Sequence, residues 1–234
     1  MVYEPPTRAT FKATLQRALR DPNGQVFPSA TLSDFIDEAL MDMSSYRPND
    51  VIRGAPWTPD TWYPPVEVYE DISDIWQVVA REDDLDARKN TLYIPHADYA
   101  DGRAGWDFVP PTQFRITRIW VYRLQEWAKR APALILRIYG YGFRHLPTSD
   151  SSYLDFHSPI DQYCALQHCK FLGFQMLNAD RALYQQWLAA TNNTDVSPTQ
   201  LQGMLGQAEA TYDRVRQRST IIRRRPTNAD AVAF

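Results

Sequence analysis

Apolar side chains recur at steps of three and four residues in two stretches near the beginning of the chain, residues 7–20 and 32–45. This spacing places them on one face of a helix, so the pattern predicts two amphipathic helices. The first helix should end at the turn-forming sequence DPNG, and Thr31 and Asp34 should form a capping box at the start of the second.

Between residue 49 and about residue 150 the pattern changes to prolines, tryptophans and short apolar runs. The runs predict strands at residues 75–80, 91–94, 114–124 and 133–140. The stretch VIRGAPWTPDTWYPP should be an extended connector, because its prolines lack N–H donors. Together these signals predict an inserted, antiparallel β-sandwich-like domain.

Helical patterns return after the insertion. Ser158 followed by Pro159 is typical of a helix start, and apolar residues then continue over about thirty residues on more than one face. A helix of this kind needs burial on most sides, which favours a packed neighbouring subunit. Ser197, Pro198 and Gln200 predict a last helix that starts with a capping box, runs unbroken to about Arg223 and has a protruding basic end.

The predicted fold is therefore α+β. Residues 1–48 form an N-terminal helical pair, residues 49–157 the inserted β domain, residues 158–222 two long C-terminal helices that complete the helical domain, and residues 223–234 a basic C-terminal arm.

Charge is unevenly distributed along a chain whose formal net charge is −3. Residues 214–234 contain six arginines and a single acid, which leaves 19 basic and 27 acidic residues in residues 1–213. Blocks of this kind usually belong to interaction arms, whose partner is nucleic acid or an acidic protein surface. The block is followed by the apolar sequence AVAF, which ends on Phe234.

Candidate chemistry is sparse. Cys164 and Cys169 would point about 140° apart on one helix, so they are expected to be buried free thiols, as suits a reducing compartment. The four histidines lack ligand spacing, and no phosphate loop, GxSxG, HExxH or calcium loop is present. We therefore expect no metal, cofactor or catalytic residue, and we expect a soluble, unexported protein without a membrane segment.

The aromatic residues of the β region leave one alternative open. They are typical of core filling and subunit contacts, but they also suit stacking on sugars or single-stranded bases, as in a glycan-binding module. They are Trp57, Trp62, Tyr63, Trp76, Trp106, Trp120 and Trp127.

Three stretches carry a resemblance to a known family. They are LSDFIDEALMDMSSYRP, similar to an acidic second helix; LRIYGYGFRHLPTSDSSYLDF, similar to a last strand and turn that lead into a long apolar helix; and the basic C-terminal helix and tail. By these stretches and the order of its parts, the chain resembles the head-to-tail adaptor, or head-completion, proteins of tailed bacteriophages. The large β insertion departs from the smallest, all-helical members.

The resemblance implies a structural protein of the virion neck, assembled in the host cytoplasm. Copies would form a ring, dodecameric in the family, that joins the capsid portal to a tail or neck protein, with packaged DNA as a further contact in the lumen. The portal-docking residues, by position, would be Arg214, Arg216, Arg218, Arg223, Arg224, Arg225 and Phe234. The alternative is a nucleic-acid-binding protein that uses the arginine-rich C-terminal helix on phosphates.

Overall fold

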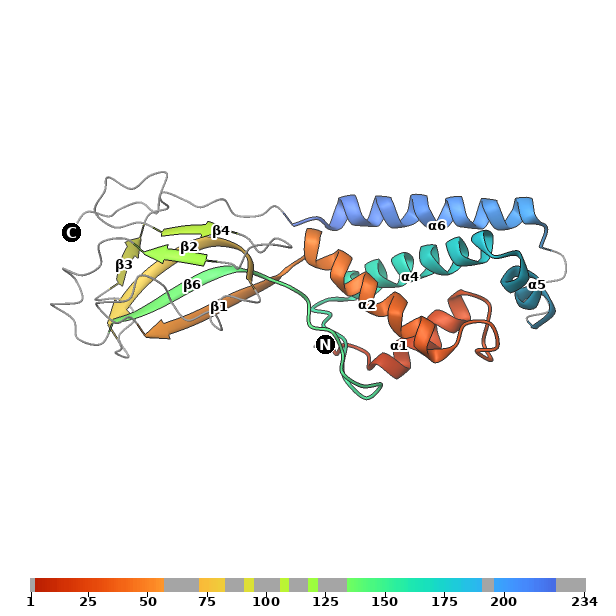
Figure 1. The fold of residues 1–234 in the computed structure, drawn as a ribbon, viewed down its shortest axis with the longest axis horizontal. Helices are drawn as coiled ribbons and strands as arrows, with labels where there is room; N and C mark the ends of the chain where they lie inside the picture. Colours follow the sequence, from red (N-terminus) through yellow and green to blue (C-terminus); the bar gives the residue numbers. More distant parts are fainter. Residues whose placement is uncertain are drawn as a thin grey trace. The chain divides into compact units, whose positions relative to one another are not determined.

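The computed structural model of the chain describes residues 3–56, 72–82, 91–94, 106–109, 118–121, 134–190 and 196–221. Internal contacts divide the chain into two compact units (Figure 1). The helical unit consists of Met1–Arg47 and Arg144–Ile221, and the β unit includes the residues from Pro48 to Phe143. The chain is α+β, as its sequence predicts.

The two N-terminal helices match the predicted pair. Helix α1 is Arg8–Ala18, and the side chain of Thr7 caps its first turn. Helix α2 is Ser29–Tyr46, so it begins about one turn before the predicted start. The predicted capping box of Thr31 and Asp34 is wrong, because both residues already lie inside the helix.

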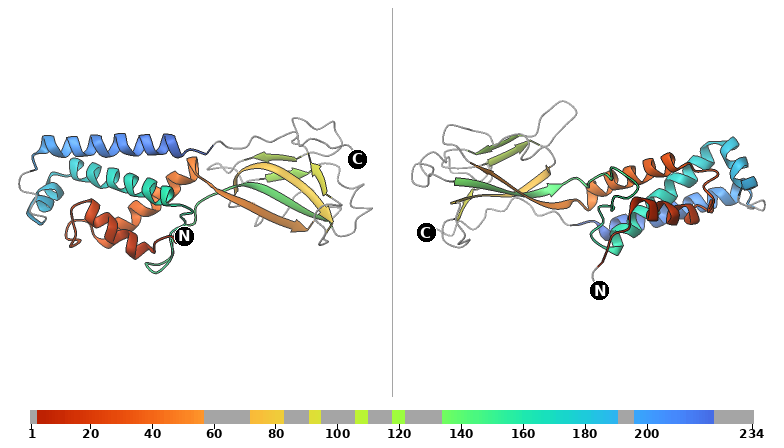
Figure 2. Two further views of the ribbon diagram at one scale, coloured as in Figure 1. Left: turned by 180° about the vertical axis from the view of Figure 1, so that it is seen from behind. Right: turned by 90° about the horizontal axis from the view of Figure 1, so that it is seen from below.

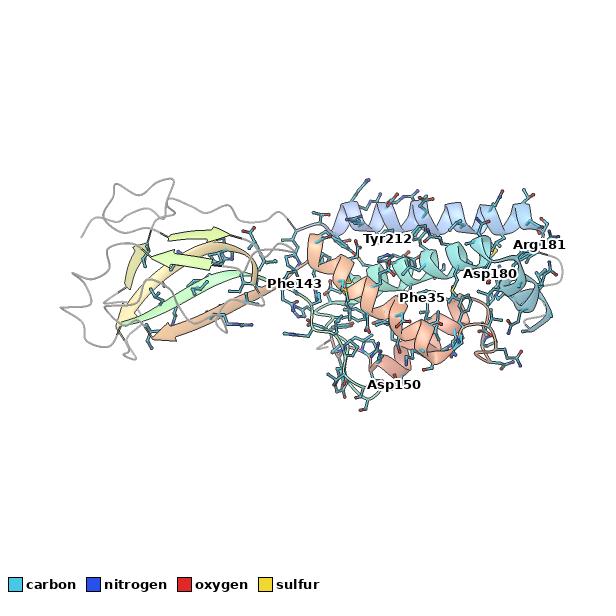
Figure 3. The ribbon with its side chains drawn as sticks, in the orientation of Figure 1. Phe35, Phe143, Asp150, Asp180, Arg181 and Tyr212 are labelled. Carbon is cyan, nitrogen blue, oxygen red and sulfur yellow. The ribbon has the colours of Figure 1, made fainter. Side chains whose placement is uncertain are left out.

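The predicted thirty-residue helix is two helices. Helix α4, Pro159–Ala179, begins with the predicted cap at Ser158, and helix α5 is Arg181–Ala190. Asp180 separates them, because its backbone is extended and its carboxylate accepts hydrogen bonds from two N–H groups in the first turn of α5. Figure 3 shows Asp180 at this break.

Helix α6 is Pro198–Ser219, and the predicted capping box of Ser197 and Gln200 is confirmed. The helix ends four residues before Arg223, so the predicted unbroken run to that residue is wrong. Thr220 leaves the helical conformation, with φ −59° and ψ 123°.

Helix α4 lies in the middle of the helical unit, where it packs against α1, α2, α5 and α6. In Figures 1 and 2 α6 runs alongside α4. The helices of the same chain thus cover most of α4, whereas the sequence pattern favours a neighbouring subunit. Ile160, Tyr163 and Met176 remain exposed on α4. The largest fully buried side chains of this unit include Phe11, Leu15, Leu19, Phe27, Leu32, Ile36, Leu40, Met43 and Trp187.

Residues 144–157 belong to the helical unit, so the predicted end of the β domain at residue 157 is wrong. Leu154 and Phe156 are buried in the helical core. The N–H of Leu154 donates to the carbonyl of Pro6 over 3.0 Å, and the N–H of Arg8 donates to the carbonyl of Ser152 over 2.9 Å. This segment therefore fastens the beginning of the chain to the start of α4.

The β unit contains two antiparallel sheets in the described residues. The first has the strand order β1–β6–β2–β3, and the second pairs β4 with β5. Whether the two form a sandwich stays a prediction. The strands are β1 Asn49–Pro56, β2 Ile72–Glu82, β3 Thr91–Ile94, β4 Trp106–Val109, β5 Arg118–Val121 and β6 Leu134–Gly142.

Strand β1 corrects the prediction that the whole of VIRGAPWTPDTWYPP is an extended connector. Its first six residues lie in β1, which pairs with β6 from Asn49 opposite Gly142 to Pro56 opposite Ile135. The proline is tolerated because it is the last residue of an edge strand. The remainder of this stretch lies outside the described residues, as does most of the predicted strand at residues 114–124, of which 118–121 is β5.

Candidate functional site

The basic end of α6 is the part of the predicted site that the structure describes. Arg214 and Arg218 are exposed, whereas Arg216 contacts groups of its own chain. The Nη2 atom of Arg216 is 3.6 Å from Oδ1 of Asp42, and its guanidinium carbon is 5.5 Å from the ring centre of Tyr46. Its side chain still keeps 43% of its surface exposed.

A cluster around Asp42 joins α6 to α2 and α4. The hydroxyl of Tyr212 donates to Asp42, and the ring of His168 stacks on the Tyr212 ring with centres 4.5 Å apart. Burial, assisted by the bond to Asp42, raises the pKa of Tyr212. Burial lowers the pKa of His168, although the nearby carboxylates of Asp42 and Glu38 oppose this effect. The stacked rings are therefore neutral near pH 7, and Figure 3 shows Tyr212 between α6 and α4.

The end of α6 is also anchored through the backbone. The N–H of Ile221 donates to the carbonyl of Tyr46 over 2.9 Å, and Nη1 of Arg47 donates to the carbonyl of Ser219 over 2.8 Å. The prediction that the basic end of the last helix protrudes is therefore wrong for the residues up to Ile221. Arg223, Arg224, Arg225 and Phe234 lie outside the described residues.

Asp161, in the first turn of α4, is fully buried beside two arginines. Its carboxylate is 2.7 Å from Nε of Arg47 and 3.3 Å from Nη1 of Arg144, and it accepts a 2.8 Å hydrogen bond from the N–H of His157. Burial by itself would raise the pKa of Asp161. The two guanidinium groups and the backbone hydrogen bond outweigh burial, so the pKa of Asp161 is lowered.

The two arginines mark the points where the chain leaves and re-enters the helical unit. Arg47 is the last residue before the β unit and Arg144 the first residue after it. The Nε atom of Arg144 donates to the carbonyl of Arg47 over 2.9 Å, and its N–H donates to the hydroxyl of Ser44 over 2.9 Å. Arg47 also donates to the carbonyl of Ser219. The end of α2, the segment that begins at Arg144 and the end of α6 therefore meet around Asp161.

The described residues offer little reactive chemistry. Cys164 and Cys169 are buried free thiols, as predicted, and burial raises the pKa of both, so the thiols stay protonated and are poor nucleophiles. In the same part of the chain, no group of three or more His, Cys, Asp or Glu side chains is placed to hold a metal ion. No described helix is long and apolar enough to span a membrane.

The sequence analysis did not identify Asp42 and Asp161, the two acids that contact several segments of this region. The partners of Asp42 lie on α4 and α6, more than a hundred residues away, so no local pattern reveals them. Asp161 did carry a signal, because it is the only acid within the apolar helix α4. A lone acid on a helix that is apolar nearly all round is expected to have a buried cationic partner.

No protein-family model matches the chain, and no curated protein matches it.

Proposed function

We propose that this protein is a structural virion protein whose copies form a ring between the capsid portal and the tail or neck, docking on the portal through the C-terminal basic segment. The order of its parts and the three stretches quoted above support this proposal. One observation carries it: α6 is fixed to its own unit up to Ile221, two residues before the arginine block at residues 223–225.

An anchored helix end suits docking by the chain that follows it. A segment that starts from a fixed point loses less conformational freedom on binding than one that starts from a frayed helix. Because Arg216 is engaged with Asp42, the docking residues become Arg214, Arg218 and the arm, with Arg223, Arg224, Arg225 and Phe234. Simultaneous docking by many copies would turn weak single contacts into a durable join.

Removal of residues 222–234 tests this assignment. The shortened chain keeps the hydrogen bond of Ile221, so it should fold normally, as measured by circular dichroism and thermal unfolding. It should no longer join the portal of the same virus in electron micrographs of mixed particles. Normal joining by the shortened chain would show that the arm is not the docking element.

Charge reversal at Arg223–Arg225 provides the matched test. Joining should weaken and lose its dependence on salt, because screened charge attraction supplies part of the contact. Retention of the full-length protein on DNA-cellulose at physiological salt, lost in the same variant, would favour the nucleic-acid alternative. The exposed acids Glu209 and Asp213 beside Arg214 weigh against phosphate binding by α6.

A further inference from the structure

A groove of about 360 Å³ opens between the end of α1, α4 and α6. Arg20 and Lys170 provide two cations in its lining, and none of the described residues that line it is an acid. Phe174, Met204 and Ala208 supply apolar surface in the same groove. The groove therefore favours an occupant that combines carboxylates with an apolar side chain.

Gln167 adds a neutral polar group to the lining of the groove. This residue is only 6% exposed and lines the groove, yet its amide has no hydrogen-bond partner among the described residues. The amide nitrogen and oxygen are not among the fully buried side-chain atoms without a partner, so they keep contact with solvent in the groove. They are therefore placed to donate to or accept from an occupant of the groove. Neither Arg20 nor Lys170 forms an ion pair within the described part of the chain.

The outer face of α2 has the complementary chemistry. Asp34, Glu38 and Met41 follow one another at steps of four and three, and all three are exposed, Met41 by 58%. Neither acid has an ion-pair partner in the described residues, and like charges four residues apart on a helix repel. We call these three residues the α2 stripe.

The groove and the α2 stripe lie on opposite sides of α4. The Sγ atom of Cys169 donates to the carbonyl of Phe35 in α2, so this side of α4 faces α2. Gln167 lies two residues earlier, about 160° away around the helix, so the groove opens on the side away from α2. The stripe is exposed on α2, with Glu38 near His168 of α4. Since the groove opens on the other side of α4, one chain cannot place its own stripe in its own groove.

We propose that the groove binds the α2 stripe of a second copy of this chain. The acids of the stripe would face the cations of the groove, and Met41 would pack on its apolar part. The contact is heterologous, so each copy keeps one surface for the next neighbour, and repetition closes a ring where the rotation allows it. Only the closure into a ring rests on the proposed function. The contact between two copies does not, since it is tested with the chain alone.

Paired charge reversals test the contact by sedimentation equilibrium over a range of concentrations. The groove variant R20E/K170E and the stripe variant D34K/E38K should each weaken self-association by about tenfold or more, because attraction becomes repulsion. An equimolar mixture of the two should recover it, since each groove then meets a stripe of opposite charge. The control E209K/D213K reverses two exposed acids of α6 outside the groove and should associate as the unaltered chain does.

Three results would overturn this contact: an unaltered chain that stays monomeric, a control that weakens association as much as the stripe variant, or a mixture that does not recover. Thermal unfolding of each variant establishes that it is folded. The chain shortened after Ile221 should self-associate like the full chain. Failure of portal docking and failure of the copy-to-copy contact are thus separate results.

Discussion

At the scale of single residues, the most important charged contact described in the helical unit is centred on Asp161. It neutralises two arginines whose side chains are 17% and 2% exposed, Arg47 and Arg144. Such an arrangement contributes little net stability compared with an apolar substitute, but removal of one member leaves the others buried without a counter-charge. The effect of the Asp161 carboxylate on stability is therefore seen more clearly when the carboxylate is removed than when the intact cluster is compared with apolar side chains.

D161N should lower the free energy of unfolding by about 3 kcal/mol, because two guanidinium groups lose their counter-charge in a buried site. Urea unfolding at pH 7 measures the change. The control is E209Q, since Glu209 is an exposed acid of α6 and forms no ion pair among the described residues. That exchange should cost no more than about 1 kcal/mol, and an equal loss in both variants would contradict the assignment.

The pH dependence of the same variant has a definite sign. The pKa of Asp161 is lowered in the folded chain, so its contribution is complete above the ordinary carboxyl pKa and disappears as pH falls through the folded value. The difference in stability between the unaltered chain and D161N should therefore shrink below about pH 4. A difference that grows on acidification would contradict this account.

At the scale of elements, close approach between helices depends on small residues at particular positions. A Cβ atom placed on Gly173 of α4 would lie 2.5 Å from Cδ2 of Leu19, a fully buried side chain. By contrast, a Cβ placed on Gly206, on the exposed face of α6, would have no neighbour within 4 Å among the described residues, apart from its own helix backbone and the adjoining residues. Both glycines lie in helices, but a larger residue would clash with a neighbour only at Gly173.

G173A and G206A should therefore change stability in opposite directions. G173A should cost about 1–3 kcal/mol through overpacking against Leu19. G206A should add about 0.5–1 kcal/mol, because alanine is the better helix former and meets no neighbour. Chemical unfolding of both variants provides the measurement, and a stabilising G173A would mean that α1 and α4 pack less closely than described.

The elements also show what a local pattern reveals. Ser158 and Ser197 were recognised as helix starts because a cap is a local feature of sequence. The break at Asp180 was missed because apolar periodicity continues across it, and β1 was missed because the later prolines dominated its stretch. The contacts of Asp42, Arg47 and Arg216 were beyond local patterns altogether, since their partners are distant in sequence.

At the scale of the whole molecule, the stretch Pro48–Phe143 of the β unit is inserted between the two segments of the helical unit. The entry and exit points lie side by side, because Asn49 pairs with Gly142 in the sheet and Arg144 donates to Arg47. Neighbouring ends of this kind are typical of inserted domains, which can often be removed without loss of the parent fold.

Replacement of residues 49–142 by a Gly/Ser linker of about four residues should leave the helical unit folded, because adjacent antiparallel chains are only about 5 Å apart. Circular dichroism should show a helical protein that unfolds in one cooperative transition. The isolated stretch 48–143 is the companion sample for spectroscopy. Loss of cooperative unfolding in the linked helical protein would mean that the helical unit depends on the β unit.

The split helical unit also sets an order of events during synthesis on the ribosome. Helices α1 and α2 emerge first, but their packing partner α4 begins only at Pro159, after the whole stretch 48–143 has been made. Domains generally fold as their residues become available. The strands of the stretch 48–143 are therefore synthesised before α1 and α2 can pack against α4. Only when Asp161 has been synthesised can Arg47 and Arg144, at the two ends of the insertion, form their ion pairs with it.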